Sequence, residues 1–148
     1  MIVFALRHAD RMPEDALSAP GIKRAKLLAR MLGQSGVQAA WCSDTIRAQD
    51  TLRPLKQLLG TELAIEVVAL GNPDGAHEQH IIAAVKALPA DATAAVIGHS
   101  DTVGAIIKGL TGQTVGKIAE HEFDKLFVLS IPAAGAATVT LLRYGEPT

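Results

Sequence analysis

The chain has 148 residues, the size of one compact domain with a hydrophobic core of its own. Hydrophobic residues make up 49% of the sequence and charged residues 20%, which is typical of a folded protein and excludes a disordered chain. The formal net charge of −1 and the aromatic content of 3% argue against nucleic-acid binding, which needs a basic surface or stacking platforms.

The first predicted element is a buried strand that ends at a charged pair. The apolar run Ile2–Leu6 is typical of a strand covered on both faces in a parallel sheet, and Arg7 and His8 follow it directly. In parallel sheets ligands bind outside the carboxyl ends of the strands. Arginine can clamp a phosphate or carboxylate, and histidine can act as a nucleophile near neutral pH. We therefore expect a ligand site at this end.

A loop and an amphipathic helix come next. Residues 9–17 are polar and mixed and predict a loop over the site, in which Asp10 and Arg11 form a solvated pair. Ser18 is the expected N-cap of a helix that ends at Gly33. Its apolar positions share one face, namely Ile22, Ala25, Leu28, Ala29 and Leu32. Its basic positions are expected to face solvent, namely Lys23, Arg24, Lys26 and Arg30.

The second strand is predicted at Ala39–Ser43 and contains Cys42, the only cysteine, which we expect to be a buried structural thiol. A helix over residues 45–59 follows, capped by Ser43 or Asp44, and Pro54 should kink or shorten it. Arg47 falls in its first turn, where the helix dipole disfavours a cation. An anion held between the helix start and the guanidinium would explain that placement.

The remaining elements continue the alternation of strands and helices. We predict strands at residues 63–68, 93–97, 126–131 and 137–143, and helices at residues 76–88 and from a cap at Ser100 or Asp101 to about 110. Turn-forming residues predict loops at 71–75 and 111–122. This order predicts a single α/β domain over residues 1–148, with a mostly parallel central sheet between helices on both faces and one antiparallel strand near the C-terminus.

Three segments carry a resemblance to a known family. They are Arg7-His8 after the first strand, Ser43-Asp44-Thr45-Ile46-Arg47-Ala48-Gln49-Asp50-Thr51 after the second, and Gly98-His99-Ser100 after the fourth. In this order they resemble the histidine phosphatase superfamily, the phosphoglycerate-mutase-like enzymes. Chain length is most similar to the short bacterial phosphohistidine phosphatases of the SixA type. The resemblance covers about Ile2 to Lys108, and it implies a three-layer phosphoglycerate-mutase-like fold.

The chemistry of these residues and the resemblance indicate the same roles. His8 is expected to attack phosphorus through an unprotonated ring nitrogen and form a phosphohistidine, while its other nitrogen donates to a backbone carbonyl. Arg7, Arg47 and His99 are expected to bind the phosphoryl oxygens, whose charge they stabilise in the transition state. Fixed cations can supply this stabilisation, so we expect neither a metal nor another cofactor.

The proton donor is the least defined part of this site. Larger relatives use a Glu or Asp after the third strand, and the candidates here are Glu78, in a helix first turn, and Asp74, in a loop. We expect Glu78 to be the better placed, because helix starts are positioned more rigidly than loop tips. A weak or missing acid would suit a phosphohistidine substrate, because an imidazole leaving group needs less protonation than an alkoxide.

Other interpretations remain open from the sequence. His77, His80 and His121 could form a zinc site, although surface histidines are the expected interpretation. Ser100 could be a hydrolase nucleophile, but the Gly-x-Ser-x-Gly pattern is absent. A small phosphomonoester is an alternative substrate to a phosphohistidine protein, and binding of a phosphorylated ligand without turnover is an alternative to catalysis. We expect a cytoplasmic protein with no membrane partner, since neither a signal peptide nor a membrane-length apolar run is present, and no oligomeric state is indicated.

Overall fold

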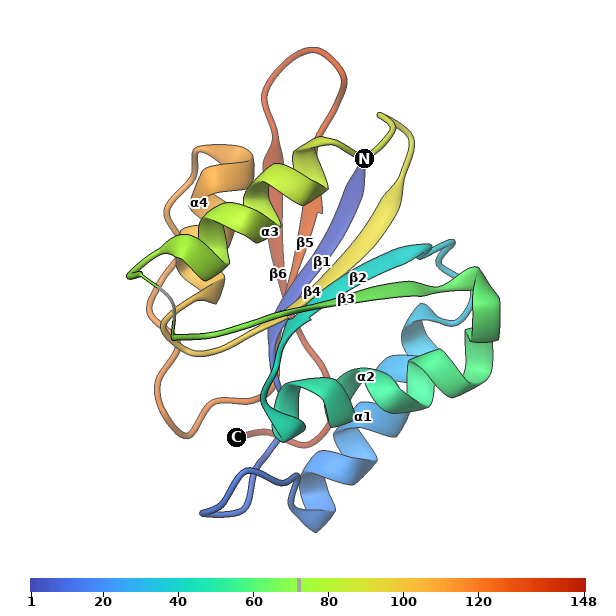
Figure 1. The fold of residues 1–148 in the computed structure, drawn as a ribbon, viewed down its shortest axis with the longest axis vertical. Coiled ribbons are helices and arrows are strands. Elements are labelled where there is room, and N and C mark those ends of the chain that lie inside the picture. The colour runs from blue at the N-terminus through green and yellow to red at the C-terminus, as the bar shows by residue number, and fades with distance from the viewer. Residues whose placement is uncertain (72) are drawn as a thin grey trace.

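A computed structural model describes residues 1–71 and 73–148 as six strands and four α-helices around one central sheet (Figure 1). The strands lie in the order β3-β2-β4-β1-β5-β6. Their bounds are β1 Ile2–Arg7, β2 Ala39–Ser43, β3 Ala64–Val68, β4 Thr93–Gly98, β5 Lys125–Ser130 and β6 Thr138–Arg143. All six predicted strands are therefore present, with ends within two residues of those expected.

The sheet is mostly parallel, as predicted. β1 pairs in parallel with β4, and β2 pairs in parallel with both β4 and β3. β5 runs antiparallel to β1, and β6 runs antiparallel to β5, so β5 is the single strand of opposite direction. The parallel arrangement brings the carboxyl ends of β1, β2 and β4 to one edge, which is the edge where Arg7, Ser43 and Gly98 end their strands.

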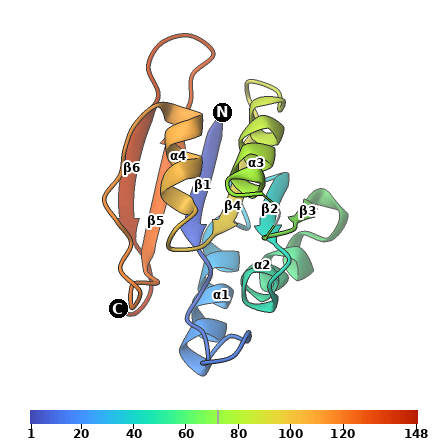
Figure 2. The ribbon, with the colours of Figure 1, turned by 60° about the vertical axis from the view of Figure 1, so that its left-hand side comes forward.

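Two helices cover each face of the sheet (Figure 2). α1, Ala19–Leu32, and α2, Ile46–Leu59, pack on one face, and α3, Ala76–Lys86, and α4, Val103–Thr111, pack on the other. The first layer is built on Leu28, Leu52 and Leu55, and the second on Ile81 and Ile106, all of them completely or almost completely buried. The predicted three-layer α/β fold is confirmed, and a short 3₁₀ turn, Gly60–Glu62, connects α2 to β3.

Local details differ from the prediction at the helix ends. Thr45 caps α2, because its side chain accepts from the Ala48 amide, so the expected caps Ser43 and Asp44 are wrong. α4 begins at Val103 rather than directly after Ser100 or Asp101. α2 continues through Pro54 to Leu59, so the proline does not shorten the helix; burial of Leu52 and Leu55 offsets the one backbone hydrogen bond it removes.

Two further expectations meet different outcomes. Ser18 caps α1 as predicted, with its side chain accepting from the Gly21 amide, but Ile22 is 47% exposed rather than on the inner face.

The predicted loop at 71–75 contains Asn72, which lies outside the described residues; its last part is a turn in which the Ala76 amide donates to the Pro73 carbonyl. In the described part of the chain no helix is both long and apolar enough to cross a membrane.

Arg24 is buried rather than solvated, which corrects the interpretation of the basic face of α1. Its side chain is 2% exposed and its Nε donates to Asp10 at 2.6 Å. Its other guanidinium nitrogens donate to the carbonyls of Tyr144 and Glu146 near the C-terminus. Asp10 therefore pairs with Arg24 and not with Arg11. Sequence periodicity could not anticipate this, because the partners are 14 and about 120 positions away.

We expect Arg24→Met to lower the free energy of unfolding by about 3 to 5 kcal/mol, because it leaves the Asp10 carboxylate and two carbonyls without their buried donor. Urea unfolding followed by circular dichroism measures this change. Arg30→Met on the exposed side of the same helix is the control, with an expected change within about 0.5 kcal/mol. Equal effects of the two substitutions would show that the buried network does not stabilise the fold.

Candidate active site

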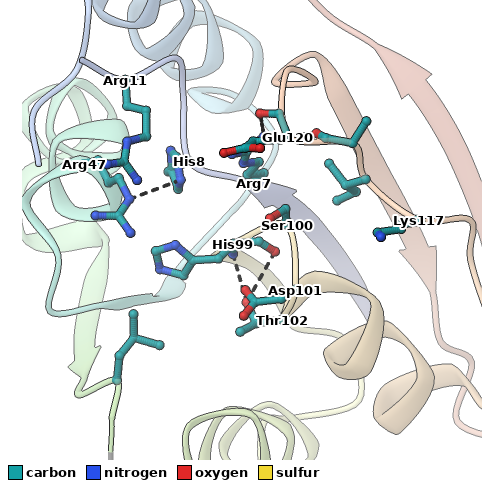
Figure 3. Close-up of a pocket in the computed structure, with 13 residues that line it drawn as sticks. Arg7, His8, Arg11, Arg47, His99, Ser100, Asp101, Thr102, Lys117 and Glu120 are labelled. Atoms are coloured by element: carbon teal, nitrogen blue, oxygen red, sulfur yellow. Dashed lines mark hydrogen bonds between the residues drawn. The ribbon is translucent and has the colours of Figure 1, made fainter. Parts of the chain in front are cut away.

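A cavity of about 740 Å³ opens at the carboxyl ends of β1 and β4 (Figure 3). The residues that line it come from the end of β1, the start of α2, the loops after β1, β3 and β4, and the loop before β5: Arg7, His8, Arg11, Arg47, Leu70, His99, Ser100, Asp101, Thr102, Lys117, Ile118, Ala119 and Glu120. The four residues that the sequence analysis placed together, Arg7, His8, Arg47 and His99, are all in this lining.

Arg7 is buried behind the cavity and fixed by the loop before β5. Its Nη1 lies 2.6 Å from the Glu120 carbonyl and 2.9 Å from that of Glu122, with Ala119 at 3.2 Å. Its guanidinium carbon lies 4.1 Å from the centre of the Phe123 ring. These contacts leave Nε buried without a partner among the described residues. The cation is thus held rigidly, with an unused donor.

His8 has the tautomer that a nucleophile needs. Its ring is 2% exposed, and Nδ1 lies 2.8 Å from the Ala9 carbonyl oxygen. A carbonyl can only accept, so Nδ1 carries the proton and Nε2 presents a lone pair. Arg47 Nε lies 3.3 Å from Nε2, and the His99 ring centre lies 5.1 Å from that of His8. The expected backbone carbonyl partner is therefore present, and it is the carbonyl of the adjacent residue.

Burial keeps both histidines neutral. It lowers the pKa of His8 to about 3, more than the neighbouring His99, Arg7 and Arg47 charges do, although the bond to the Ala9 carbonyl opposes the shift. Burial, followed by the Arg47 charge, lowers the pKa of His99 to about 4. The charges of Arg7 and Arg47 are thus smaller causes of the lowered His8 pKa than burial is.

We expect the carbon-bound ring protons of His8 and His99 to keep constant NMR chemical shifts from pH 8 to pH 5, because a lowered pKa preserves the neutral ring below the usual midpoint near 6.5. The lowered pKa values of the two histidines should also make the fold less stable as pH falls below 6.5, because the unfolded chain then binds protons that the folded protein does not bind. Free imidazole added to the sample is the reference. Titration of His8 near pH 6.5 would contradict this prediction.

An anion lies at the start of α2, as the position of Arg47 suggested, but it belongs to the protein. The Asp15 carboxylate accepts from the backbone amides of Ile46 at 2.9 Å and Arg47 at 3.0 Å, and from Arg47 Nη1 at 2.9 Å. Donation from the Ile46 amide is the largest cause that lowers the Asp15 pKa. The carboxylate cancels the unfavourable dipole interaction and orients Arg47, so that Nε points at His8.

The last residue of the second motif, Thr51, connects the loop after β1 to α2. The Thr51 hydroxyl accepts from the Ala9 amide at 2.9 Å and lies 2.8 Å from the Arg47 carbonyl one turn earlier in α2. Thr51 is completely buried. The loop that carries His8 and the helix that carries Arg47 are therefore joined through one side chain. The spacing of Arg47 and Thr51, four residues apart, places both on the same side of the helix.

The proposed acids lie outside the cavity lining. Glu78 is half-buried in the first turn of α3 and Asp74 is exposed in the turn before it, and neither contacts the four site residues through a hydrogen bond. The general acid therefore stays a prediction. Ser100 and Asp101 line the cavity instead. Sequence analysis missed Asp15 as a site residue, and the signal that could have found it was the unbalanced cation in the first turn of α2.

His77 and His80, in the first part of α3, contact groups of β3. His77 is 5% exposed, with Nδ1 3.1 Å from the Val68 carbonyl, and His80 pairs with Glu66 at 2.7 Å. His121 is exposed in the loop before β5. Across residues 1–71 and 73–148, no group of three His, Cys, Asp or Glu side chains is placed to hold a metal ion. Cys42 is completely buried as predicted, and burial raises the pKa of its thiol to about 11.

Comparisons with known proteins agree with this geometry. A model of the histidine phosphatase superfamily (branch 1) matches residues 7–69, which contain the first two motifs. A search of curated protein sequences gave no significant match. Among solved structures, the protein histidine phosphatase SixA complexed with tungstate is 23% identical, with 97% of each chain covered and a TM-score of 0.71.

Two other structures have the same fold. A structure assigned as phosphohistidine phosphatase SixA from Nakamurella multipartitia is 22% identical, with 99% of this chain and 95% of that chain covered and a TM-score of 0.63. The mycobacterial glucosyl-3-phosphoglycerate phosphatase in complex with VO3 is 17% identical, with 97% and 98% covered and a TM-score of 0.64. The family match over residues 7–69 and the shared fold therefore support the resemblance to the histidine phosphatase superfamily predicted from the three motifs.

Proposed function

We propose that this protein is a phosphatase that works without a metal, through a phosphohistidine on His8, and that a protein phosphorylated on histidine is its substrate. The observation that carries the proposal is the tautomer of His8. Its Nδ1 donates to the Ala9 carbonyl, and its Nε2 lone pair faces Arg47 within a cavity that also contains Arg7. This arrangement fits a nucleophile beside a site for a dianion.

The reaction would proceed in two steps. In the first, the Nε2 lone pair of His8 attacks phosphorus, the bond to the leaving group breaks, and the leaving group departs with the electron pair. Arg47, which now donates toward His8, would then donate to a phosphoryl oxygen, and Arg7 Nε would offer its unused proton to another. In the second step water attacks the phosphohistidine, which releases inorganic phosphate and restores the His8 lone pair.

The choice of a phosphohistidine substrate is supported by what surrounds the cavity. Neither Glu78 nor Asp74 is in the lining, and both histidines there are neutral near pH 7. Such a site offers little protonation to an alkoxide, but an imidazole leaving group needs less. Two of the similar structures bear the name SixA, and one of these is described as a protein histidine phosphatase.

A small phosphomonoester is the second candidate, because the mycobacterial structure of the same fold is a glucosyl-3-phosphoglycerate phosphatase. The test is a panel of purified substrates that contains a phosphohistidine protein, a phosphoserine peptide and several sugar and glycerate phosphates, assayed in the presence of EDTA. We expect the phosphohistidine protein to give the highest kcat/KM. A higher kcat/KM for a phosphomonoester would make that compound class the substrate in place of a phosphohistidine protein. Tight phosphate binding without turnover of any substrate would indicate a binding domain.

A further inference from the structure

A chain of two hydroxyl groups connects the start of α2 to the ring of His99. The Ser43 Oγ lies 2.8 Å from the Thr45 Oγ1 on one side and 2.8 Å from the His99 Nε2 on the other. Ser43 is completely buried at the end of β2, and the His99 ring is 7% exposed. Both Ser43 contacts are short and the one to His99 is buried, so the positions of their protons determine which nitrogen of His99 carries hydrogen.

Counting donors and acceptors favours one set of proton positions. Thr45 Oγ1 accepts from the Ala48 amide, and Ser43 Oγ accepts from the Thr45 amide, each at 3.3 Å. If the Thr45 hydroxyl donates to Ser43, the Ser43 proton is free to donate to His99 Nε2, and both hydroxyl protons and His99 Nε2 have partners. The reverse order leaves the Thr45 proton without an acceptor among the described residues. The first order is therefore favoured.

The opposite side of the His99 ring faces the cavity. His99 is part of the cavity lining, and its Nδ1 has no hydrogen-bond partner in the described protein, yet it is not among the fully enclosed unpartnered atoms. The ring is held near His8, with the two ring centres 5.1 Å apart. A proton on Nδ1 would therefore be available to a group bound beside the nucleophile.

We propose that Ser43 is a positioning residue: it donates to Nε2 of His99 and thereby keeps this ring in the Nδ1–H tautomer, whose proton is directed to a phosphoryl oxygen. The assignment of the phosphoryl oxygen as the acceptor rests on the proposed function, whereas the assignment of the tautomer does not. The lowered pKa of His99 agrees with a neutral ring, in which only one nitrogen carries a proton. A charged ring would donate from both nitrogens and would need no such selection.

The tautomer can be measured without any substrate. In protein labelled with ¹⁵N-histidine, two-dimensional spectra that correlate ring nitrogens with ring carbon-bound protons distinguish a protonated from an unprotonated nitrogen. At pH 7 we expect wild-type His99 to show a protonated Nδ1 and a hydrogen-bonded, unprotonated Nε2. The opposite assignment in the wild-type protein would overturn the inference, whatever the phosphatase assays show.

Substitution at Ser43 tests its part in this selection. Ser43→Ala removes the donor to Nε2, so we expect His99 to change to a mixture of tautomers or to the Nε2–H form. With the substrate identified by the panel, kcat should fall about 10- to 100-fold, with a much smaller change in KM. A variant that keeps both the wild-type His99 spectrum and the wild-type kcat would overturn the inference.

Thr102→Val is the matched control for the spectrum. The Thr102 hydroxyl accepts from the His99 backbone amide at 2.8 Å and does not contact the ring, so its loss should leave the tautomer unchanged. Tautomer loss in this variant as well as in Ser43→Ala would show that general loosening around His99 is the cause. Failure of the proposed function has a different signature, since an inactive wild-type protein with a protonated Nδ1 would leave the tautomer assignment intact.

Discussion

Replacing His8 with alanine is expected to lower kcat by about 10⁴-fold or more, because no other group can form the covalent intermediate. The side chains around it would remain, but Arg7 and Arg47 can only stabilise charge and cannot supply a lone pair. Single-turnover measurements on the phosphohistidine protein, with inorganic phosphate as the product followed, give this number directly. Activity close to that of the wild type would exclude His8 as the nucleophile.

A trapping experiment tests whether the phosphoryl group is transferred to His8 itself. Acid-quenched samples are unsuitable because phosphohistidine is acid-labile, so the wild-type protein should be quenched in base. The label from ³²P-substrate should then be found on His8. His8→Asn is a more conservative variant, since its amide can still donate to the Ala9 carbonyl in place of Nδ1. It should fold like the wild type and carry no label. His80→Ala, at the exposed pair with Glu66, is the control that should keep both label and activity.

Replacing Arg47 with glutamine is expected to lower kcat/KM by about 10³-fold. Arginine groups that contact a phosphoryl group in its transition state contribute on this scale in related chemistry. Here the loss has two parts, because the guanidinium both faces the attacking nitrogen of His8 and forms an ion pair with Asp15 at 2.9 Å. Steady-state kinetics on the same substrate measure the effect.

Arg53→Gln is the matched control on the same helix. Arg53 pairs with Asp50 at the surface, where its side chain is 64% exposed, and exposed pairs of this kind contribute little. We expect kcat/KM to stay within about twofold of the wild type, since a surface charge acts on the site only through screened fields. If Arg47→Gln lost no more activity than Arg53→Gln, the guanidinium could not be part of the site.

The placement of the four central residues followed from chain order. Arg7, His8 and His99 come directly after buried apolar runs, and Arg47 comes at the start of the helix after another. In a parallel sheet all such junctions open on one edge, so side chains that are far apart in sequence meet there. The same logic could not place Glu78, because its distance from the cavity depends on how α3 leaves β3, which no local pattern specifies.

The hydrogen-bond and ion-pair partners of the arginines could not be predicted from local sequence patterns. Arg24 looked like a solvated residue of an amphipathic helix, but it lies under the C-terminal segment and binds Asp10. Asp15 looked like a loop residue, but it caps α2 and holds Arg47. Arg7 donates through Nη1 to backbone carbonyls that include that of Glu120, 113 positions later in the chain.

The sequence alone therefore determined the order of strands and helices, the direction of the sheet and the edge at which the reactive side chains gather, because hydrophobic periodicity and parallel topology are properties of short segments. Only the tertiary structure decided which carboxylate or carbonyl each arginine meets and which nitrogen of each histidine is free. Those outcomes depend on distances between segments that are far apart in the sequence and meet only in the folded protein. The free energy of a buried charge depends on its nearest partner in space rather than on its neighbours in sequence.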